Sequence, residues 1–259
     1  MAVTTALVKE LRERTGAGMM DCKKALVEAE GDFELAVENL RKKGQKVAAN
    51  RADRDSAEGA VLAKVNADNT AAVVVSVNCE TDFVAKNESF VTLANQLAEL
   101  AISHETMDDF LNCEIDSMSV NEKLIQQTGV IGEKLVIGNF EKVSAGYVGK
   151  YIHAGNKIAT LVGFSKPVDG IEEASKNVAM QAAAMAPVAV DQSQIPADLI
   201  AQETQIGRDL AIQEGKPAEL ADKIALGRLN KWYKQVTLVT QPFIKHNKQT
   251  IAHYVNSTC

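Results

Sequence analysis

Apolar residues at helical spacing mark three short segments at the start of the chain. They predict helices over residues 5–14, 19–31 and 32–43. Gly16, Gly31 and Gly44 follow these segments and are the expected helix ends. Asp32 is placed to cap the third helix. Helices this short bury little surface individually, so we expect them to pack as a three-helix N-terminal domain over residues 1–50.

A charged stretch poor in large apolar residues follows, from Lys42 to Glu58, and it predicts a linker at 51–57. The pattern then changes to strand-like apolar runs. They predict strands over 60–66, 71–77 and 134–143, and a helix over 89–103. A second helix is expected to begin at Ser119, because Ser119 and Glu122 have the spacing of a capping box. These elements form one predicted subdomain, residues 58–143.

A similar succession of elements begins again later in the chain. Gly146–Ile152 shares small, apolar and lysine positions with Ala60–Asn66, and each segment leads through a polar turn into an apolar strand. The predicted elements of the second copy are a strand over 157–164 and a helix over 171–186. We therefore expect two related α+β subdomains in tandem, the second formed by 144–190 and 235–247.

Two amphipathic segments near the end of the chain, 197–213 and 217–234, are joined by the short connection Glu214–Pro217. So short a joint forces two helices to run antiparallel. The pattern therefore predicts a helical hairpin over 197–234, inserted into the second subdomain.

The chain is expected to return to the core after this hairpin. Val236–Val239 is interpreted as a strand, and the C-terminal segment 248–259 holds a weak helix at 250–255. The predicted fold class is α+β, with a three-helix N-terminal domain, a core of two related α+β subdomains and an inserted antiparallel helical hairpin.

Composition narrows the class of protein. Of the 259 residues, 46% are hydrophobic and 24% charged, as in ordinary globular domains. The formal net charge of -6 argues against direct binding of nucleic acid or of an anionic membrane. The longest apolar run, Ala71–Val75, is far too short to span a membrane, and Met1–Arg12 lacks the apolar core of a signal peptide. We expect a cytoplasmic protein.

The reactive side chains form no recognisable metal or catalytic pattern. The cysteines are scattered without a C-x-x-C pair and without a histidine cluster, at Cys22, Cys79, Cys113 and Cys259. Phosphate-loop, dinucleotide-binding, zinc-protease and nucleophile-elbow motifs do not occur. We predict no catalytic residue, no metal and no cofactor. A thiol enzyme that uses Cys79 or Cys22 stays open as an alternative.

Several motifs resemble the elongation factor Ts family, in order along nearly the whole chain. The two most specific are TGAGMMDCKKAL at 15–26 and VNCETDFVAKN at 77–87. Further matches are LRKKGQKVAANRADRDSAEG at 40–59, GVIGEKLVI at 129–137, YVGKYIHAGNKIATLV at 147–162, VAMQAAAMAP at 178–187, GKPAELADKIALGRLNKW at 215–232 and QPF at 241–243. The chain is thereby identified as a member of this family of nucleotide exchange factors for the GTPase elongation factor Tu. The resemblance implies a UBA-like N-terminal domain and a protruding coiled-coil hairpin.

The resemblance also implies a mechanism. In the family, one segment enters the GTPase beside its Mg²⁺ site, an aromatic ring wedges between the elements that support the ion and the phosphate loop, and Mg²⁺ and then GDP are lost. GTP binding then displaces the factor. The matching residues here are Thr81, Asp82, Phe83 and Val84. Further expected contacts to the GTPase are Met19, Met20 and Gln181.

Two places depart from the family pattern. Gln181 stands where the family usually has a histidine, and an amide can form hydrogen bonds but cannot titrate. Gly138 and Asn139 stand where the family often has a basic pair.

Without the resemblance, the same residues have ordinary structural interpretations. Asp82 would cap a helix and Phe83 would be a core aromatic residue. Met19 and Met20 would be packing residues, although adjacent residues of a helix cannot both face one core. The hairpin would be a dimerisation arm, so a dimer of heterodimers formed through it stays open. The main rival function is an interaction module or scaffold without exchange activity.

Overall fold

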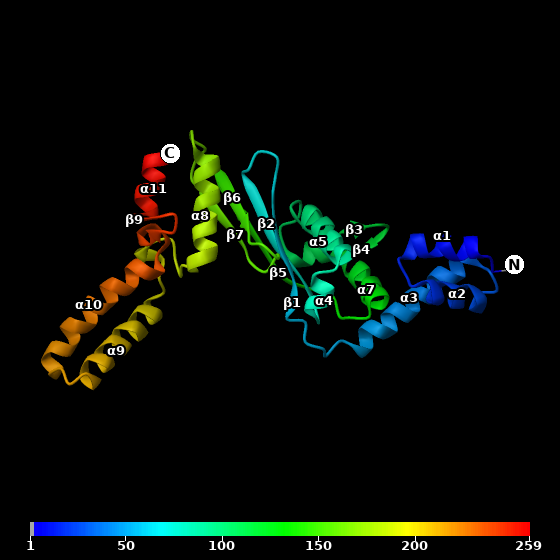
Figure 1. The fold of residues 1–259 in the computed structure, drawn as a ribbon, viewed down its shortest axis with the longest axis horizontal. Helices are drawn as coiled ribbons and strands as arrows, with labels where there is room; N and C mark the ends of the chain where they lie inside the picture. Colours follow the sequence, from blue (N-terminus) through cyan, green and yellow to red (C-terminus); the bar gives the residue numbers. More distant parts are fainter. Residues whose placement is uncertain (1–2) are drawn as a thin grey trace. The chain divides into compact units, whose positions relative to one another are not determined.

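Residues 3–259 are described by a computed structural model, in which the chain divides into two units (Figure 1). Of the described residues, the first unit comprises 3–66, 72–142 and 152–159, and the second comprises 67–71, 143–151 and 160–259. Helices and small sheets occur in both units, which confirms the predicted α+β class.

The elements of the first unit are α1 (Thr5–Thr15), α2 (Met19–Glu28), α3 (Phe33–Asn50), β1 (Glu58–Val65), β2 (Ala71–Cys79), α4 (Asp82–Ala85), α5 (Glu88–Ala101), α6 (Met107–Asn112), β3 (Glu114–Ile115), β4 (Met118–Ser119), α7 (Val120–Ile131) and β5 (Val136–Ser144), whose last residues extend into the second unit. The elements of the second unit are β6 (Tyr147–Ile152), β7 (Ala159–Phe164), α8 (Ile171–Met185), η1 (Gln192–Gln194), α9 (Ala197–Gln213), α10 (Ala218–Val236), η2 (Leu238–Thr240), β8 (Pro242–Phe243), β9 (His246–Thr250) and α11 (Ile251–Thr258).

The first three helices pack around a small core of their own. Leu11, Cys22 and Leu26 are fully buried in it. The Asp32 side chain accepts a hydrogen bond from the Leu35 amide and caps α3 as predicted. The second helix ends before the predicted Gly31, because the left-handed turn at its end begins at Glu30 (φ 51°).

The third helix does not stop at Gly44, so that predicted end is wrong. α3 continues to Asn50, and Gly44 lies against Gly129 of α7. Two glycines facing each other let the helix backbones approach closely, which a side chain at Gly129 would prevent. Arg41 of α3 forms an ion pair with Glu122 of α7 beside this contact.

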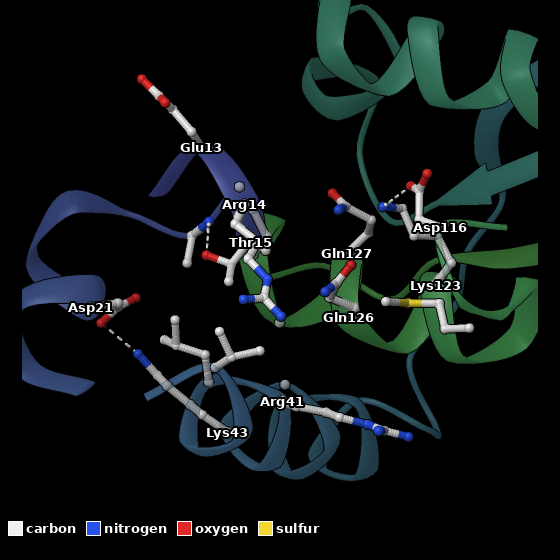
Figure 2. A pocket seen from close by; sticks show the side chains of 18 of the residues that line it. Glu13, Arg14, Thr15, Asp21, Arg41, Lys43, Asp116, Lys123, Gln126 and Gln127 are labelled. Carbon is white, nitrogen blue, oxygen red and sulfur yellow. Dashed lines mark hydrogen bonds and ion pairs between the residues drawn. The ribbon is translucent and has the colours of Figure 1, made fainter. Parts of the chain in front are cut away.

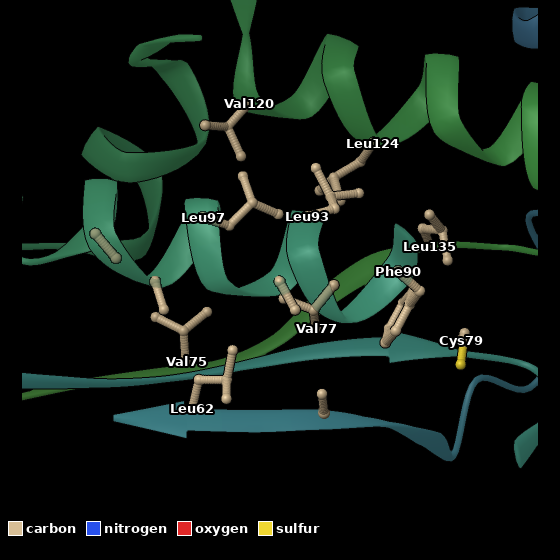
Figure 3. Close-up of a cluster of buried hydrophobic side chains, with 14 of the residues drawn as sticks. Leu62, Val75, Val77, Cys79, Phe90, Leu93, Leu97, Val120, Leu124 and Leu135 are labelled. Carbon is tan, nitrogen blue, oxygen red and sulfur yellow. The ribbon is translucent and has the colours of Figure 1, made fainter. Parts of the chain in front are cut away.

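A layered core occupies the rest of the first unit. β1, β2 and β5 form a sheet in that order, and β1 pairs antiparallel with β2 from Glu58↔Cys79 to Val65↔Ala72. Figure 3 shows α5 lying on this sheet and α7 lying beyond α5. The buried side chains between the layers are Leu62, Val75, Val77, Phe90, Leu93, Leu97, Val120 and Leu124. Ser119 and Glu122 form the predicted capping box at the start of α7.

The second unit also begins with a strand pair followed by a helix. β6 pairs with β7, and the Thr160 hydroxyl of β7 donates to the Ala179 carbonyl of α8 (2.7 Å). Phe243 stacks on Tyr254 of α11 with ring centroids 4.3 Å apart. The predicted weak helix at 250–255 is present as α11, which Thr250 caps.

The two longest helices of the second unit, α9 and α10, pack side by side (Figure 1). Gly207 faces Ala225 at their contact, and Arg208 pairs with Asp222 at 3.1 Å. No helix within residues 3–259 is both long and apolar enough to cross a membrane.

The strand predicted at Val236–Val239 is wrong. α10 extends to Val236, and the Thr237 hydroxyl at its end donates to the Tyr233 carbonyl. The next residues form the 3₁₀ helix η2. β-branched residues favour strands, and residues 188–190 do lie beside this segment: the amides of Leu238 and Val239 donate to the carbonyls of Ala189 and Val190. Only one β-bridge, between Thr237 and Ala189, results, because the Thr240 and Gln241 amides turn back to the Thr237 carbonyl and coil the segment into η2.

Candidate functional site

The segment predicted to act on a partner lies where β2 ends and the short helix α4 begins. Thr81 precedes α4 in an extended conformation, and its hydroxyl accepts a hydrogen bond from the Val84 amide (3.4 Å). Val84 is half-buried and Ala85 is buried, and both pack against the large core of the first unit. Because one side of this single turn is held by the core, Asp82 and Phe83 lie on its outer side.

Phe83 is 82% exposed, so its interpretation as a core aromatic residue is wrong. It has the highest exposed fraction of the large apolar side chains described as exposed within residues 3–259. Thr81, and not Asp82, caps the turn, so the second structural alternative is wrong as well. A large exposed apolar side chain on an anchored turn is available for contact with another molecule.

Glu133 holds this segment through hydrogen bonds to its first residues. It directly follows Gly132, the left-handed residue that ends α7 (φ 83°). Its Oε2 accepts hydrogen bonds from the backbone N–H of Glu80 (3.1 Å) and of Thr81 (3.0 Å). Its Oε1 accepts from the Thr81 hydroxyl (2.6 Å). Both oxygens of one carboxylate therefore fix the two residues that lead into α4.

A second anchor reaches the same place from α3. Arg51, directly after this helix, donates through Nη1 to both carboxylate oxygens of Glu80 (2.8 Å each). The Lys134 amide also donates to Glu80 Oε1 (2.6 Å), and the Lys134 ammonium donates to the carbonyls of Ala52 and Arg54. The Lys134 amide first, and then Arg51, hold the pKa of the Glu80 carboxyl below its ordinary value.

The charge next to Phe83 is locally balanced. Asp82 forms an i,i+4 ion pair with Lys86 at 2.6 Å. The hydrogen bond from Lys86 lowers the pKa of Asp82, so this carboxyl is ionised at neutral pH. Both side chains are exposed, and an exposed pair of this kind can be exchanged for contacts to a partner at little cost.

Cys79, the last residue of β2, is unsuited to nucleophilic chemistry. Cys79 is fully buried, and its thiol donates to the Thr81 carbonyl (3.2 Å). Burial raises the pKa of Cys79 to about 11. Cys22 is fully buried too, and burial raises its pKa. Nucleophilic cysteines need a thiolate and access to substrate, so this environment argues against a thiol enzyme built on either residue.

The other predicted contacts belong to other elements of the chain. Met19 and Met20 begin α2, where Met20 is 74% exposed and Met19 is partly exposed. Gln181 lies in α8 of the second unit and is fully buried. It donates to Gln241 Oε1 and to the Pro242 carbonyl (3.1 Å each) and accepts from the Ile244 amide (2.9 Å). This burial contradicts a direct contact between its side chain and a partner in this conformation.

One cavity of the first unit lies between the three-helix domain and α7 (Figure 2). Its volume is about 760 Å³. Several of the charged side chains that line it form ion pairs with each other: Lys43 with Asp21 (2.6 Å) and Lys123 with Asp116 (2.8 Å). Within residues 3–259 no group of three or more His, Cys, Asp or Glu side chains is arranged to hold a metal ion. The cavity therefore offers no evident ligand chemistry.

Sequence reasoning missed the anchoring residues Glu80, Glu133 and Arg51. The first two lie inside the motifs VNCETDFVAKN and GVIGEKLVI, but their distance along the chain gave no sign that they meet. The Gly-Glu pair at the end of a helix was the one local signal, because it marked where α7 stops.

Comparison with known proteins places the chain among translation factors. The family model described as elongation factor TS matches residues 80–258. The protein named elongation factor Ts of Christiangramia forsetii is 58% identical over 255 residues, which cover 98% of this chain and 93% of the relative. The elongation factor Ts of Flavobacterium psychrophilum is 56% identical with the same coverage, and that of Amoebophilus asiaticus is 46% identical over 258 residues, 98% of this chain and 93% of the relative.

Proposed function

Because the chain belongs to the elongation factor Ts family, whose members serve translation elongation as nucleotide exchange factors for elongation factor Tu, we propose that the Thr81–Val84 segment carries the exchange activity. The factor binds the GDP form of the GTPase and inserts this segment near the Mg²⁺ site. Mg²⁺ and then GDP leave. The observation that supports this proposal is the exposed Phe83 on a turn anchored by Glu133 and the core.

The energy available from Phe83 fits such a role. A thousandfold weakening of a bound nucleotide requires about 4.1 kcal/mol of differential binding. Burying a phenylalanine side chain contributes roughly 1.5–3 kcal/mol. Since 82% of Phe83 is exposed, nearly all of this contribution is still available for a partner. Asp82 and the neighbouring backbone supply the remainder.

Displacement by GTP follows from the same energetics. If binding of the exchange factor lowers the affinity of the GTPase for nucleotide by a given ratio, bound nucleotide lowers the affinity of the GTPase for the exchange factor by the same ratio. A high concentration of GTP therefore releases the factor, which then acts on another GTPase molecule. The segment needs no chemical step of its own, and we assign no catalytic residue and no cofactor.

Further contacts are proposed for the N-terminal helices. The exposed side chains of Met19 and Met20 would extend the interface to the GTPase. The buried Gln181 side chain contributes indirectly, because its hydrogen bonds hold the 241–244 segment in place. A dimer of heterodimers formed through α9 and α10 remains a proposal, and we place the protein in the cytoplasm, where elongation takes place.

The test is stopped-flow release of fluorescent GDP from elongation factor Tu. The natural protein should accelerate release strongly. Phe83→Ala should lower the acceleration roughly 10- to 100-fold, which corresponds to the loss of roughly 1.5–3 kcal/mol. A matched control is Val190→Ala, which shortens an apolar side chain that is 49% exposed and lies outside the proposed interfaces, and it should leave the acceleration within about twofold.

Two results would decide against the proposal. Tight binding of the natural protein to the GTPase without faster GDP release would favour the scaffold alternative. Full acceleration by a folded Phe83→Ala variant would show that exchange does not depend on the aromatic ring. The second result would favour the exposed methionines of α2 as the residues that carry exchange.

A further inference from the structure

We infer that Glu133 is a positioning residue for exchange: it sets the direction in which Phe83 is presented, without touching the GTPase itself. This inference rests on the proposed function of the Thr81–Val84 segment. It assigns a role to a residue that lies 50 positions away from Phe83 along the chain and enters the site only through the fold.

The argument starts from the backbone at the end of β2. The pairing of β1 with β2 stops at Glu58↔Cys79, so Glu80 and Thr81 have left the antiparallel ladder. Their N–H groups are directed instead to Glu133 Oε2, at 3.1 and 3.0 Å. Two adjacent N–H groups that bond to one carboxylate oxygen hold the peptide planes of this segment in a single orientation.

The second step connects the carboxylate to the helical turn. The Thr81 hydroxyl donates to Glu133 Oε1 (2.6 Å) and accepts from the Val84 amide (3.4 Å). Donation to the carboxylate fixes the rotation of the hydroxyl, so that its lone pairs face the amide. Two hydrogen bonds thus connect Glu133 through the Thr81 hydroxyl to the Val84 amide. Phe83 lies within the turn that the second of these bonds closes.

The third step explains why the fold should survive loss of this carboxylate. The neighbouring Lys134 amide donates to Glu80 Oε1 (2.6 Å), and Arg51 binds the same carboxylate. Val84 and Ala85 also remain packed on the core. Removing the Glu133 carboxylate therefore leaves the segment attached, while the direction of the first turn of α4 is no longer fixed.

The test measures GDP release over a range of factor concentrations, which separates half-saturation from the maximal rate. A misplacement of about 1 Å can lower a rate up to about 100-fold, so Glu133→Ala should lower the maximal release rate about 10- to 100-fold. Half-saturation should change less than about threefold, because the remaining interface is intact. The control Glu141→Ala, an exposed acidic residue of β5, should change neither quantity.

A conservative variant and a double variant test whether the role is positional. Glu133→Gln should restore most of the maximal rate, because its amide oxygen accepts from both backbone N–H groups and its NH₂ group donates to the Thr81 hydroxyl. Glu133→Ala combined with Phe83→Ala should be no slower than Phe83→Ala alone, since Glu133 acts through Phe83.

The outcomes separate this inference from the proposed function. An unchanged maximal rate in Glu133→Ala, or effects of Glu133→Ala and Phe83→Ala that multiply, would overturn the positioning role while exchange by Phe83 stands. Full activity of Phe83→Ala would instead overturn the proposed function. Should Glu133→Ala fail to fold, as judged by circular dichroism, Thr81→Val takes its place. It removes the hydroxyl that transmits the orientation, and an unchanged maximal rate would again overturn the inference.

Discussion

The contact between Gly44 and Gly129 predicts that two outwardly similar substitutions will have opposite effects. A Cβ atom added at Gly129 would lie 2.4 Å from the Gly44 Cα, whereas one added at Gly44 would lie 3.6 Å from its nearest neighbour, the Ile125 carbonyl oxygen. The first contact is impossible without moving a helix backbone by about 1 Å. The second is an ordinary van der Waals contact.

The magnitudes follow from two opposing terms. Replacing a helical glycine by alanine favours the helix by up to about 1 kcal/mol, and both variants gain this. Overpacking a close contact costs typically about 1–3 kcal/mol, and only Gly129→Ala incurs it. We expect Gly44→Ala to be neutral or stabilising and to exceed Gly129→Ala in stability by about 1–3 kcal/mol.

The assay is urea unfolding followed by circular dichroism, together with hydrogen exchange of the amides in α3 and α7. The single tryptophan, Trp232, lies in α10 of the second unit, so its fluorescence provides an internal control that neither substitution should change. Equal stability of the two variants, or a more stable Gly129→Ala, would refute the close helix contact. Loss of exchange protection only in α3 and α7 of Gly129→Ala would support it.

Two further predictions concern titrating groups. Because burial raises the pKa of Cys79 to about 11, a thiol reagent at neutral pH should modify the exposed Cys259 first and Cys79 only after unfolding; rapid labelling of Cys79 in the native protein would contradict its burial. The folded-state pKa of Glu80 is lowered, so its carboxylate stabilises the fold above its ordinary pKa of about 4.3, and this contribution is lost as the pH falls through the lower folded value. The difference in urea midpoint between the natural protein and Glu80→Gln should therefore be constant above about pH 5 and shrink as the pH falls below it, and a difference that does not shrink over the acid range would contradict the assignment.

Elements defined by local signals could be predicted from the sequence. The cap at Asp32 and the capping box of Ser119 and Glu122 depend on residues within one helical turn, and the structure has both. The strands β1 and β2 follow from a run of apolar residues between turns. In each case the interacting groups are close along the chain, so spacing alone identifies them.

Features that depend on distant partners could not be predicted. Gly44 resembles a helix end, and only the approach of Gly129 shows why the helix continues. Val236–Val239 has the composition of a strand, and the chain at 188–190 does hydrogen-bond to it, but Thr240 and Gln241 bond back to the Thr237 carbonyl and coil it into η2, an outcome that composition does not indicate. Gln181 resembles a surface contact of the family, and its burial arises from the chain near Gln241 that returns beside α8.

Phe83 brings these two kinds of information together. Its neighbours Val84 and Ala85 are bound to the core, so the local sequence alone favours a buried ring, and roughly 1.5–3 kcal/mol of burial energy is left unused by its exposure. Yet Glu133 and Glu80 supply charged hydrogen bonds that fix this very turn. A fold selected for stability alone would have no reason to order a turn so firmly around a side chain that adds nothing to the core. The combination of strong anchoring and an unburied aromatic ring is explained if the ring is buried in a partner.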